Sequence, residues 1–269
     1  MKSVKDKLVL VTGGGSGIGR LMALDFARRG GRVVIWDLSQ KAIDQAVEEA
    51  RKEGLEISGM ICDVTNRLAV YSCAETLTGR AGPVDVLVNN AGIVNGKTLL
   101  DTADENIEKI MDVNSLSLFW TAKAFLPSML ERNTGHIVTV SSAAGLVGIS
   151  GLADYCASKF AAFGFNEAVR MEMRRLRSRV RTTVVCPFFI NTGMFDGVKT
   201  RFPLLLPILK PSYAASKIVK AVLKNRKCLI MPRFVYSIFL LRLLPVSVFD
   251  FIADFMGVNR SMESFRGRS

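Results

Sequence analysis

The strongest constraint on the fold is an alternation of short apolar runs with longer segments of helical periodicity. The apolar run at 8–12 is followed by a helical pattern at 18–29 and a second apolar run at 32–37, as in a βαβ unit. Such alternation produces parallel strands covered by helices on both faces, so we expect a doubly wound α/β protein with a mostly parallel, seven-stranded sheet. The other expected strands are 57–62, 84–89, 136–141, 181–186 and 227–231, with a last helix at 212–224.

The net charge of +12 is concentrated toward the C-terminus. Residues 199–269 hold 13 of the 36 Lys and Arg residues but only 3 of the 24 Asp and Glu residues. The same part of the chain is rich in apolar residues, and this combination fits an anionic membrane surface better than a nucleic-acid groove. We therefore expect no nucleic-acid partner.

The cysteines and the histidine do not indicate a metal site or a histidine-dependent catalytic triad. Five cysteines are scattered without metal-ligand spacing, which predicts reduced structural thiols. The single histidine, His136, lies in an expected buried strand and has no acidic partner nearby in sequence. Residues 1–7 are charged, and the apolar run after them ends in a glycine-rich turn, so we expect neither a signal peptide nor an N-terminal anchor.

A glycine-rich turn with the sequence TGGGSGIG, residues 12–19, joins the first expected strand to the first expected helix. Glycine lets the backbone turn tightly and approach a pyrophosphate closely, while the helix N-terminus faces the negative charge. The turn predicts dinucleotide binding, although an ordinary strand-to-helix connection has a similar composition. The residues expected at the cofactor are Gly13, Ser16, Gly17, Ile18 and Gly19.

Asp37 ends the second expected strand, where a carboxylate accepts hydrogen bonds from the ribose hydroxyls of adenosine. The alternatives are a helix cap or a solvated loop residue. The neighbours Trp36 and Leu38 are uncharged, so nothing offsets the repulsion between Asp37 and the 2′-phosphate of NADP. The sequence therefore favours NAD over NADP as the cofactor.

Three polar residues occur in an order that suits proton transfer. Ser142 follows the strand expected at 136–141, and Tyr155 and Lys159 share one face of an expected helix. A free tyrosine is a poor base because its pKa is about 10. The Lys159 ammonium and an oxidised nicotinamide would favour the phenolate, and Ser142 would hold the substrate oxygen. Tyrosine and lysine at this spacing also occur as a plain surface pair, so the prediction depends on their combination with the glycine turn and Asp37.

This ordered set resembles the short-chain dehydrogenase/reductase family over about residues 6–231. The resemblance implies a Rossmann-type fold, hydride transfer between a nicotinamide cofactor and an alcohol or carbonyl group, and a homodimer or homotetramer. The shared motifs are Thr12-Gly13-x-x-x-Gly17-x-Gly19, Asn89-Asn90-Ala91-Gly92, and Ser142 followed by Tyr155-x-x-x-Lys159.

The resemblance also implies roles that spacing alone does not reveal. Asn114 matches the asparagine that holds a water for a proton relay through the lysine, and Asp63 with Val64 is similar to the adenine-contacting pair. By this resemblance the catalytic set is Asn114, Ser142, Tyr155 and Lys159. The further cofactor contacts that it implies are Asp63, Val64, Asn90, Tyr155, Lys159, Pro187, Ile190 and Thr192.

One departure from the family pattern concerns the substrate. Most members have Pro-Gly after the sixth strand, whereas this chain has Pro187 and Phe188. The change places an aromatic ring near the nicotinamide, and it resembles the branch that contains epidermal-type retinol dehydrogenases and lipid-droplet 17-beta-hydroxysteroid dehydrogenases, which generally prefers NAD. The expected substrate contacts are Ser142, Tyr155, Phe188 and Phe195.

Residues 188–211 are expected to form an apolar lid over the substrate. Pro203, Pro207 and Pro211 disfavour a continuous helix there. An apolar lid indicates an apolar substrate, although any single leucine would equally suit core packing. The apolar side chains concerned are Phe195, Phe202, Leu204, Leu205, Leu206, Ile208 and Leu209.

Residues 233–269 extend beyond the expected dehydrogenase domain of residues 1–232. Their apolar runs are shorter than the roughly 20 residues that span a bilayer. Polar residues recur at helical spacing between 246 and 256, which predicts an amphipathic helix. The extension either lies on a membrane surface, held by Arg233, Arg242 and their neighbours, or packs on the protein's own cleft or on a second subunit.

These features together predict an NAD-dependent dehydrogenase of a lipophilic alcohol such as a retinoid, a steroid or a long-chain alcohol, with Tyr155 as the general acid/base. The alternative is a catalytically silent protein that binds NAD or a lipid surface. The expected location is the cytoplasm, with peripheral attachment to a membrane or lipid droplet as a second option.

Overall fold

The computed structural model describes residues 2–267 and contains one seven-stranded sheet, in the order β3-β2-β1-β4-β5-β6-β7. Every neighbouring pair in the sheet is parallel, so the predicted doubly wound architecture is confirmed, with a sheet that is parallel throughout. The strands are β1 (Leu8–Thr12), β2 (Arg32–Asp37), β3 (Ile57–Ile61), β4 (Val86–Asn89), β5 (His136–Val140), β6 (Arg181–Pro187) and β7 (Cys228–Met231).

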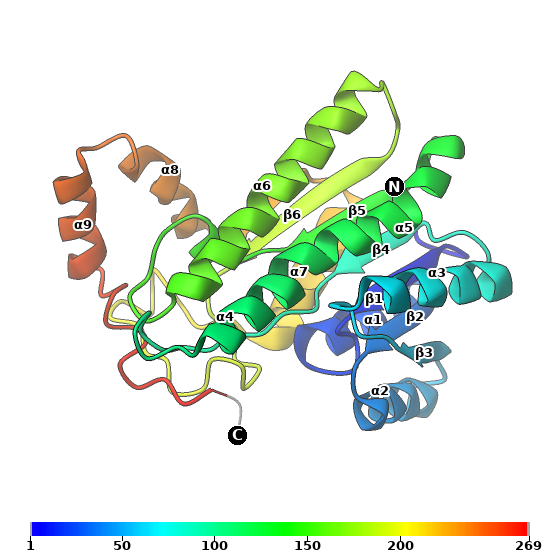
Figure 1. The fold of residues 1–269 in the computed structure, drawn as a ribbon, viewed down its shortest axis with the longest axis horizontal. Helices are drawn as coiled ribbons and strands as arrows, with labels where there is room; N and C mark the ends of the chain where they lie inside the picture. The colour runs from blue at the N-terminus through cyan, green and yellow to red at the C-terminus, as the bar shows by residue number, and fades with distance from the viewer. Residues whose placement is uncertain (1, 268–269) are drawn as a thin grey trace.

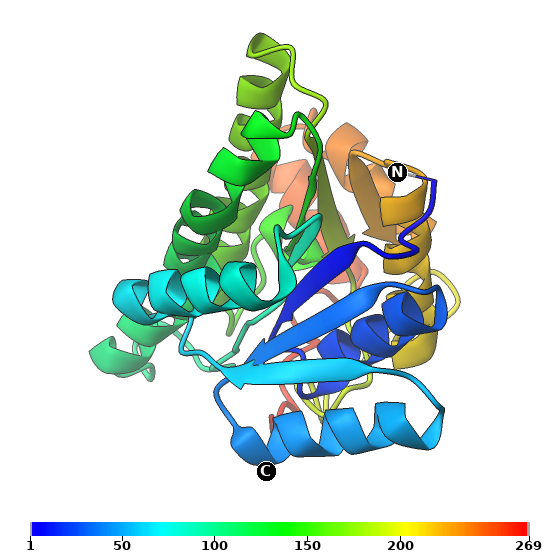
Figure 2. The ribbon, with the colours of Figure 1, turned by 90° about the vertical axis from the view of Figure 1, so that its right-hand side faces the viewer.

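Helices cover both faces of the sheet, as Figures 1 and 2 show. One layer contains α1 (Gly17–Arg28), α2 (Gln40–Lys52) and α7 (Pro211–Leu223). The opposite layer contains α3 (Arg67–Ala81), α4 (Asp104–Met111), α5 (Ser117–Glu131) and α6 (Ala153–Arg175).

The two-sided burial of the sheet explains why its strands are continuously apolar. Successive side chains of a strand point to opposite faces, and in a parallel sheet both faces are covered. In β1, Val9 and Val11 pack with the α1 and α7 layer, whereas Leu8 and Leu10 pack with the α3 and α5 layer. All five residues of β1 are buried. Continuous apolar runs in the sequence therefore correctly predicted the strands.

The strand order reverses next to β1, because β2 lies on one side of it and β4 on the other. The chain leaves these neighbouring strands in opposite directions, which opens a crevice beyond their carboxyl ends. The glycine-rich turn follows β1, and the polar segments after β4 and β5 reach the same edge. This edge of the sheet is where the fold positions a ligand site.

The segment after β7 forms three short helices: η3 (Arg233–Tyr236), α8 (Ser237–Leu241) and α9 (Val246–Phe255). Figure 1 shows α8 and α9 as a pair at one end of the molecule. The helix expected at 246–256 is present as α9, with Phe249 and Ile252 partly buried and Phe251 and Phe255 exposed. Within residues 2–267, none of the helices combines the length and the apolar character needed to cross a bilayer.

Candidate active site

A cavity of about 380 Å³ lies at the carboxyl ends of β1, β4, β5 and β6. It brings together every predicted cofactor and substrate residue, and three of the four predicted catalytic residues. Asn114 is the exception, because it lies behind the cavity wall. The predicted residues that line the cavity are Gly13, Ser16, Gly17, Ile18, Gly19, Asp37, Asp63, Val64, Asn90, Ser142, Tyr155, Lys159, Pro187, Phe188, Ile190, Thr192 and Phe195.

The glycine turn has the conformation and the close approach that only glycine permits. Gly13 and Gly17 have φ values of +61° and +55°, in the left-handed region. A Cβ atom on Gly19 would lie 2.1 Å from the Gly13 carbonyl oxygen. The start of α1 is therefore held close to the end of β1, with its backbone exposed to the cavity, as a bound pyrophosphate requires.

Thr12 and Asn90 fasten this turn to the end of β4. The Thr12 hydroxyl oxygen accepts hydrogen bonds from the backbone N–H groups of Asn90 and Ala91, at 3.0 and 3.1 Å. The Asn90 side-chain amide donates to the carbonyl oxygens of Thr12 and Gly13, at 2.9 and 3.1 Å. These bonds fix the relative position of two loops that border the same cavity.

The Asp37 carboxylate faces the glycine turn. Its Oδ2 accepts a hydrogen bond from the Gly15 N–H at 2.9 Å, and its Oδ1 accepts one from the Ser39 N–H at 3.1 Å. A carboxylate has about four acceptor positions, so lone pairs remain for a ligand hydroxyl. The carboxylate is thus oriented by the backbone and still able to accept from a ribose.

Asp63 and Val64 border the far end of the cavity, beside Leu38. The Asp63 carboxylate is turned toward its own loop, where Oδ1 accepts from the N–H and the hydroxyl of Thr65 at 2.9 and 2.7 Å. Val64 is buried and offers an apolar surface. This end of the cavity therefore combines an apolar surface at Leu38 and Val64 with a carboxylate that its own loop orients.

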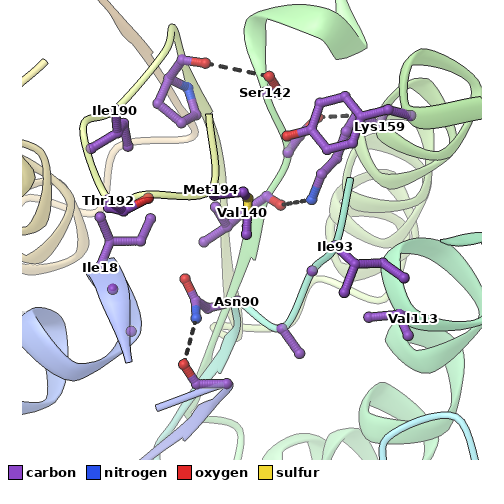
Figure 3. A pocket seen from close by; sticks show the side chains of 18 of the residues that line it. Ile18, Asn90, Ile93, Val113, Val140, Ser142, Lys159, Ile190, Thr192 and Met194 are labelled. Carbon is purple, nitrogen blue, oxygen red and sulfur yellow. Dashed lines mark hydrogen bonds between the residues drawn. The ribbon is translucent and has the colours of Figure 1, made fainter. Parts of the chain in front are cut away.

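Ser142, Tyr155 and Lys159 meet at the opposite end of the cavity. Ser142 directly follows β5 and precedes the short helix η2 (Ala143–Gly145), and its hydroxyl donates to the Pro187 carbonyl oxygen at 3.5 Å. Lys159 Nζ donates to the Val140 carbonyl oxygen at 3.1 Å and lies 5.6 Å from the centroid of the Tyr155 ring. Figure 3 shows Ser142 and Lys159 on one side of the cavity, with Ile18, Ile190 and Thr192 on the other.

Burial affects the acid–base properties of this group. Both Tyr155 and Lys159 are buried, at 5% and 4% exposure. Burial raises the pKa of Tyr155 above its usual range, and a hydrogen bond with Ser142 opposes part of that rise. Burial also lowers the pKa of Lys159 to about 8. In these surroundings the phenol therefore holds its proton more tightly than a free tyrosine, whereas the ammonium releases its proton more readily than a free lysine.

Asn114 lies in η1 (Asp112–Leu116), a π-helical turn between α4 and α5. Its Oδ1 accepts from the Ile93 N–H at 2.9 Å, and its Nδ2 donates to the Ile93 carbonyl oxygen and the Ser158 hydroxyl, both at 3.0 Å. A Cβ on Gly92 would lie 3.2 Å from Asn114 Oδ1 and 3.3 Å from Lys159 Nζ. Asn114 thus supports the backbone next to Lys159 from outside the cavity.

The predicted lid divides into buried and exposed parts. Phe195 borders the cavity and packs edge-to-face on the Tyr155 ring, with ring centroids 5.7 Å apart. Leu206 and Leu209 are buried but do not line this cavity, and Leu204 is 98% exposed. The apolar composition of 188–211 therefore overstated how many of its side chains cover the substrate region.

Two aromatic neighbours of the site were missed in the sequence. Phe189 packs between Phe188 and Phe195, with centroid distances of 4.7 and 5.1 Å. Phe265 lies 6.4 Å from Phe195 and covers Gly96, where a Cβ would clash with its ring. Phe189 directly follows Pro187 and Phe188, and this apolar run was a weak sign of its role. No local pattern connects Phe265 with Phe195 or Gly96, which lie 70 or more positions away in the chain.

Within the described part of the chain, no group of three or more His, Cys, Asp or Glu residues is arranged to hold a metal ion. The single histidine is a buried strand residue, and its Nε2 lies 2.7 Å from the Thr183 hydroxyl. The polar side chains at the Ser142 end of the cavity are the Tyr155 phenol, the Lys159 ammonium and the Ser142 hydroxyl.

Comparison with known proteins agrees with this geometry. A family model described as short chain dehydrogenase matches residues 7–201. Epidermal retinol dehydrogenase 2 of Mus musculus is 47% identical, in an alignment that covers 99% of this chain and 87% of that relative. A short chain dehydrogenase/reductase from Burkholderia phymatum in complex with NAD superposes with a TM-score of 0.81 at 25% identity, covering 90% of this chain and 95% of the other.

A metagenomic short-chain oxidoreductase in complex with NADP is also similar in structure, with a TM-score of 0.70 and 25% identity over 84% of this chain and 95% of the other. The similarity therefore includes proteins with either nicotinamide cofactor. The matched family segment contains the glycine turn, the Ser142, Tyr155 and Lys159 group, and the start of the lid. The chain therefore belongs to the short-chain dehydrogenase family and is an oxidoreductase that acts on CH–OH groups.

Proposed function

We propose that this protein oxidises a lipophilic alcohol to its carbonyl compound with NAD, and catalyses the reverse reduction. The observation that carries the proposal is the meeting of Ser142, Tyr155 and Lys159 at an apolar end of the cavity whose other end is bordered by Asp37. This places proton-transfer groups beside space for an apolar substrate.

The residues present suit a dinucleotide. The close approach at Gly13 and Gly19 leaves the backbone accessible to a pyrophosphate, and Asp37 keeps acceptor capacity for ribose hydroxyls. A bound nicotinamide supplies the acceptor or donor of the hydride. We assign Lys159 to the ribose next to the nicotinamide, and Ile190 and Thr192 to the nicotinamide side of the cavity.

In our mechanism the Ser142 hydroxyl donates a hydrogen bond to the substrate oxygen and fixes its position. During oxidation the Tyr155 phenolate takes the hydroxyl proton as the carbinol carbon loses its hydride, and in reduction the Tyr155 phenol returns the proton to the carbonyl oxygen. The Lys159 ammonium, 5.6 Å from the ring, stabilises the phenolate. It offsets the burial that opposes ionisation of Tyr155.

Asn114 has a supporting part in this proposal. Both ends of its amide are already bonded, to Ile93 and to Ser158. We assign it to holding the backbone beside Lys159, so that a water can pass protons between the lysine and the solvent. A direct contact of its side chain with the substrate is not part of the mechanism.

The preference for NAD over NADP rests on Asp37. Its carboxylate is fixed by Gly15 and Ser39, and the adjacent residues Trp36 and Leu38 carry no positive charge. A 2′-phosphate near this carboxylate would meet like charge without a compensating cation. The free 2′-hydroxyl of NAD would instead donate to it.

The preference for a lipophilic substrate rests on the wall beyond Tyr155. Phe188, Phe189 and Phe195 form a connected aromatic cluster there, and Ile149 and Leu152 complete the wall. The similarity to an epidermal retinol dehydrogenase adds support for a retinoid among the candidates. Steroids and long-chain alcohols fit the same apolar surroundings.

A turnover screen tests the proposal directly. Retinol, steroid alcohols and straight-chain alcohols are each incubated with the purified protein and NAD or NADP, and formation of the reduced cofactor is followed by absorbance. We expect turnover of apolar alcohols with NAD. Absence of turnover with every alcohol, although NAD binds, would favour the alternative of a catalytically silent cofactor-binding protein.

We also propose that the outer surface of α8 and α9 rests on an anionic membrane or lipid-droplet surface. Phe239, Leu240, Leu243 and Phe251 are exposed there, and Arg233 belongs to the same segment. Liposome flotation of the full chain and of a chain ending at Pro232 tests this. Equal flotation of both proteins would contradict it.

A homodimer or homotetramer is the assembly that we propose. Leu116 and Phe119 are exposed at the start of α5, and Phe160 is exposed on α6. Two copies would cover these side chains by pairing along the two helices. Light scattering coupled to size exclusion distinguishes the oligomers from a monomer.

A further inference from the structure

A second, smaller cavity of about 70 Å³ lies between the active site and the C-terminal helices. It is enclosed on the domain side by Val147 and Leu206, and on the other side by residues of η3, α8 and α9. Ser237 is the one residue with a polar side chain among those that line it. The lining from α8 and α9 consists of Ser237, Ile238, Leu241, Phe249, Ile252 and Ala253.

Three residues border both this cavity and the active-site cavity: Ala143, Ile149 and Phe188. Ala143 immediately follows Ser142, so the shared wall begins one residue from the group that would hold the substrate oxygen. Phe188 packs with the apolar clusters on both sides of this wall. The two spaces are therefore neighbours, separated by one layer of apolar side chains.

Arg242 holds the C-terminal helices over this space. Its guanidinium donates to the Leu146 carbonyl oxygen at 2.9 Å and lies over the rings of Phe160 and Phe249, 5.4 and 5.9 Å from their centroids. It thus joins the loop after β5, α6 and α9. The C-terminal segment is therefore fastened to the domain and supplies one wall of the small cavity.

We infer that this cavity is a second substrate-binding chamber, which receives the distal hydrocarbon part of the alcohol while its hydroxyl lies at Ser142 and Tyr155. The inference rests on the proposed function and deepens it. Its apolar lining would bury a hydrocarbon chain without leaving polar groups unsatisfied. Phe188 borders both spaces, so in this proposal its ring turns aside to let the chain cross the wall between them. The C-terminal segment thereby helps to determine the length of alcohol that the enzyme prefers.

Filling the chamber is the main test. Ala253→Phe adds a ring from α9 into the lining, whereas Ser247→Phe, which adds a ring at an exposed position of the same helix, is the matched control. The substrates are straight-chain primary alcohols of increasing length with NAD. A buried methylene contributes about fourfold to kcat/KM, so the wild-type value should rise with chain length until the chamber is full.

We expect Ala253→Phe to stop this rise at shorter chains and to lower kcat/KM for the longest alcohols by about tenfold or more. The shortest alcohols should be unaffected, and Ser247→Phe should follow the wild type. Ile238→Ala, which enlarges the chamber, should move the optimum to longer chains. Far-UV circular dichroism and the melting temperature establish whether each variant is folded.

An unchanged chain-length profile in both folded Ala253→Phe and folded Ile238→Ala would overturn the inference. In that case the wild type and both variants would oxidise long-chain alcohols with the same dependence of kcat/KM on chain length. This result would refute the role of the chamber and leave the proposed function intact. A wild-type enzyme that oxidises no alcohol of any length refutes the proposed function itself, and with it the chamber. The two failures are distinguished by the wild-type control alone.

Discussion

The Lys159 ammonium nitrogen lies 5.6 Å from the centroid of the Tyr155 ring and is held there by a hydrogen bond to the Val140 carbonyl oxygen. The bond fixes the lysine to β5, whereas the tyrosine is fixed by its position one turn earlier on α6. The distance between the charge and the phenol is therefore determined by the packing of a helix against the sheet.

Replacing Lys159 with Met should shift the pH dependence of alcohol oxidation. Loss of a nearby positive charge raises the pKa of Tyr155, so the rising part of the pH profile of kcat/KM should move upward by about one unit or more. In the wild type the ammonium itself loses its proton around pH 8, because burial lowers its pKa to about 8. Profiles that superpose for wild type and variant would contradict the role given to Lys159.

Tyr155→Phe removes the proposed acid/base while keeping the ring that packs on Phe195. We expect kcat/KM to fall by about 10²–10⁴-fold, the usual contribution of a positioned acid/base. NADH fluorescence titration should show that the cofactor still binds. Turnover retained by a variant that binds NADH would refute the assignment.

Asp37→Asn tests cofactor choice. The amide oxygen still accepts from the Gly15 N–H, but the negative charge is lost. The ratio of kcat/KM for NAD to that for NADP should fall by about tenfold or more, because repulsion of the 2′-phosphate is removed. Steady-state kinetics with both cofactors measure this ratio, and an unchanged ratio would show that another residue makes the choice.

Thr12→Val should destabilise the protein. The backbone N–H groups of Asn90 and Ala91 would lose their shared acceptor, and a buried unsatisfied donor costs about 1–3 kcal/mol. Urea unfolding should report a free energy of unfolding lower by at least about 2 kcal/mol.

Thr182→Val is the matched control for that change. The Thr182 hydroxyl is buried and has no hydrogen-bond partner in the described part of the chain. Its replacement should therefore leave the stability nearly unchanged or raise it slightly. Equal losses in the two variants would indicate that the Thr12 bonds are unimportant.

Replacing His136 should reduce the loss of folding stability at low pH. Burial lowers its pKa from 6.5 to about 3. The unfolded chain then takes up a proton that the folded protein refuses, so this contribution to stability is complete above about pH 6.5 and is lost as the pH falls toward 3. Between about pH 7 and pH 4, His136→Asn should therefore lose a few kcal/mol less stability than the wild type. Denaturant unfolding at several pH values tests this, and parallel losses would contradict it.

Much of the site was predictable because its parts are encoded locally. The glycine turn, Asp37 and the spacing of Tyr155 and Lys159 each follow from a strand or helix whose end is visible in the sequence. Parallel strands bring their carboxyl ends together, so local patterns were sufficient to gather distant residues in one cavity. The same logic located Ser142 at the end of β5.

Other features depended on contacts that have no local signature. Phe265 reaches Phe195 and Gly96, and the bond from Arg242 to Leu146 spans 96 positions in the chain. Composition also failed to distinguish Leu206, which is buried, from Leu204, which faces solvent. Such choices are made by tertiary packing between segments of comparable apolar character.

The boundary between the two sides of the active site falls near Phe188. Nearly everything assigned to the cofactor and to proton transfer precedes this residue, whereas most of the outer apolar wall, including the small cavity roofed by α8 and α9, comes after it. If the proposed function is right, exchanging the part of the chain after Phe188 between relatives should change the preferred alcohol while Ser142, Tyr155 and Lys159 stay in place. On this proposal, substrate preference and proton transfer are encoded in separate, consecutive parts of the chain.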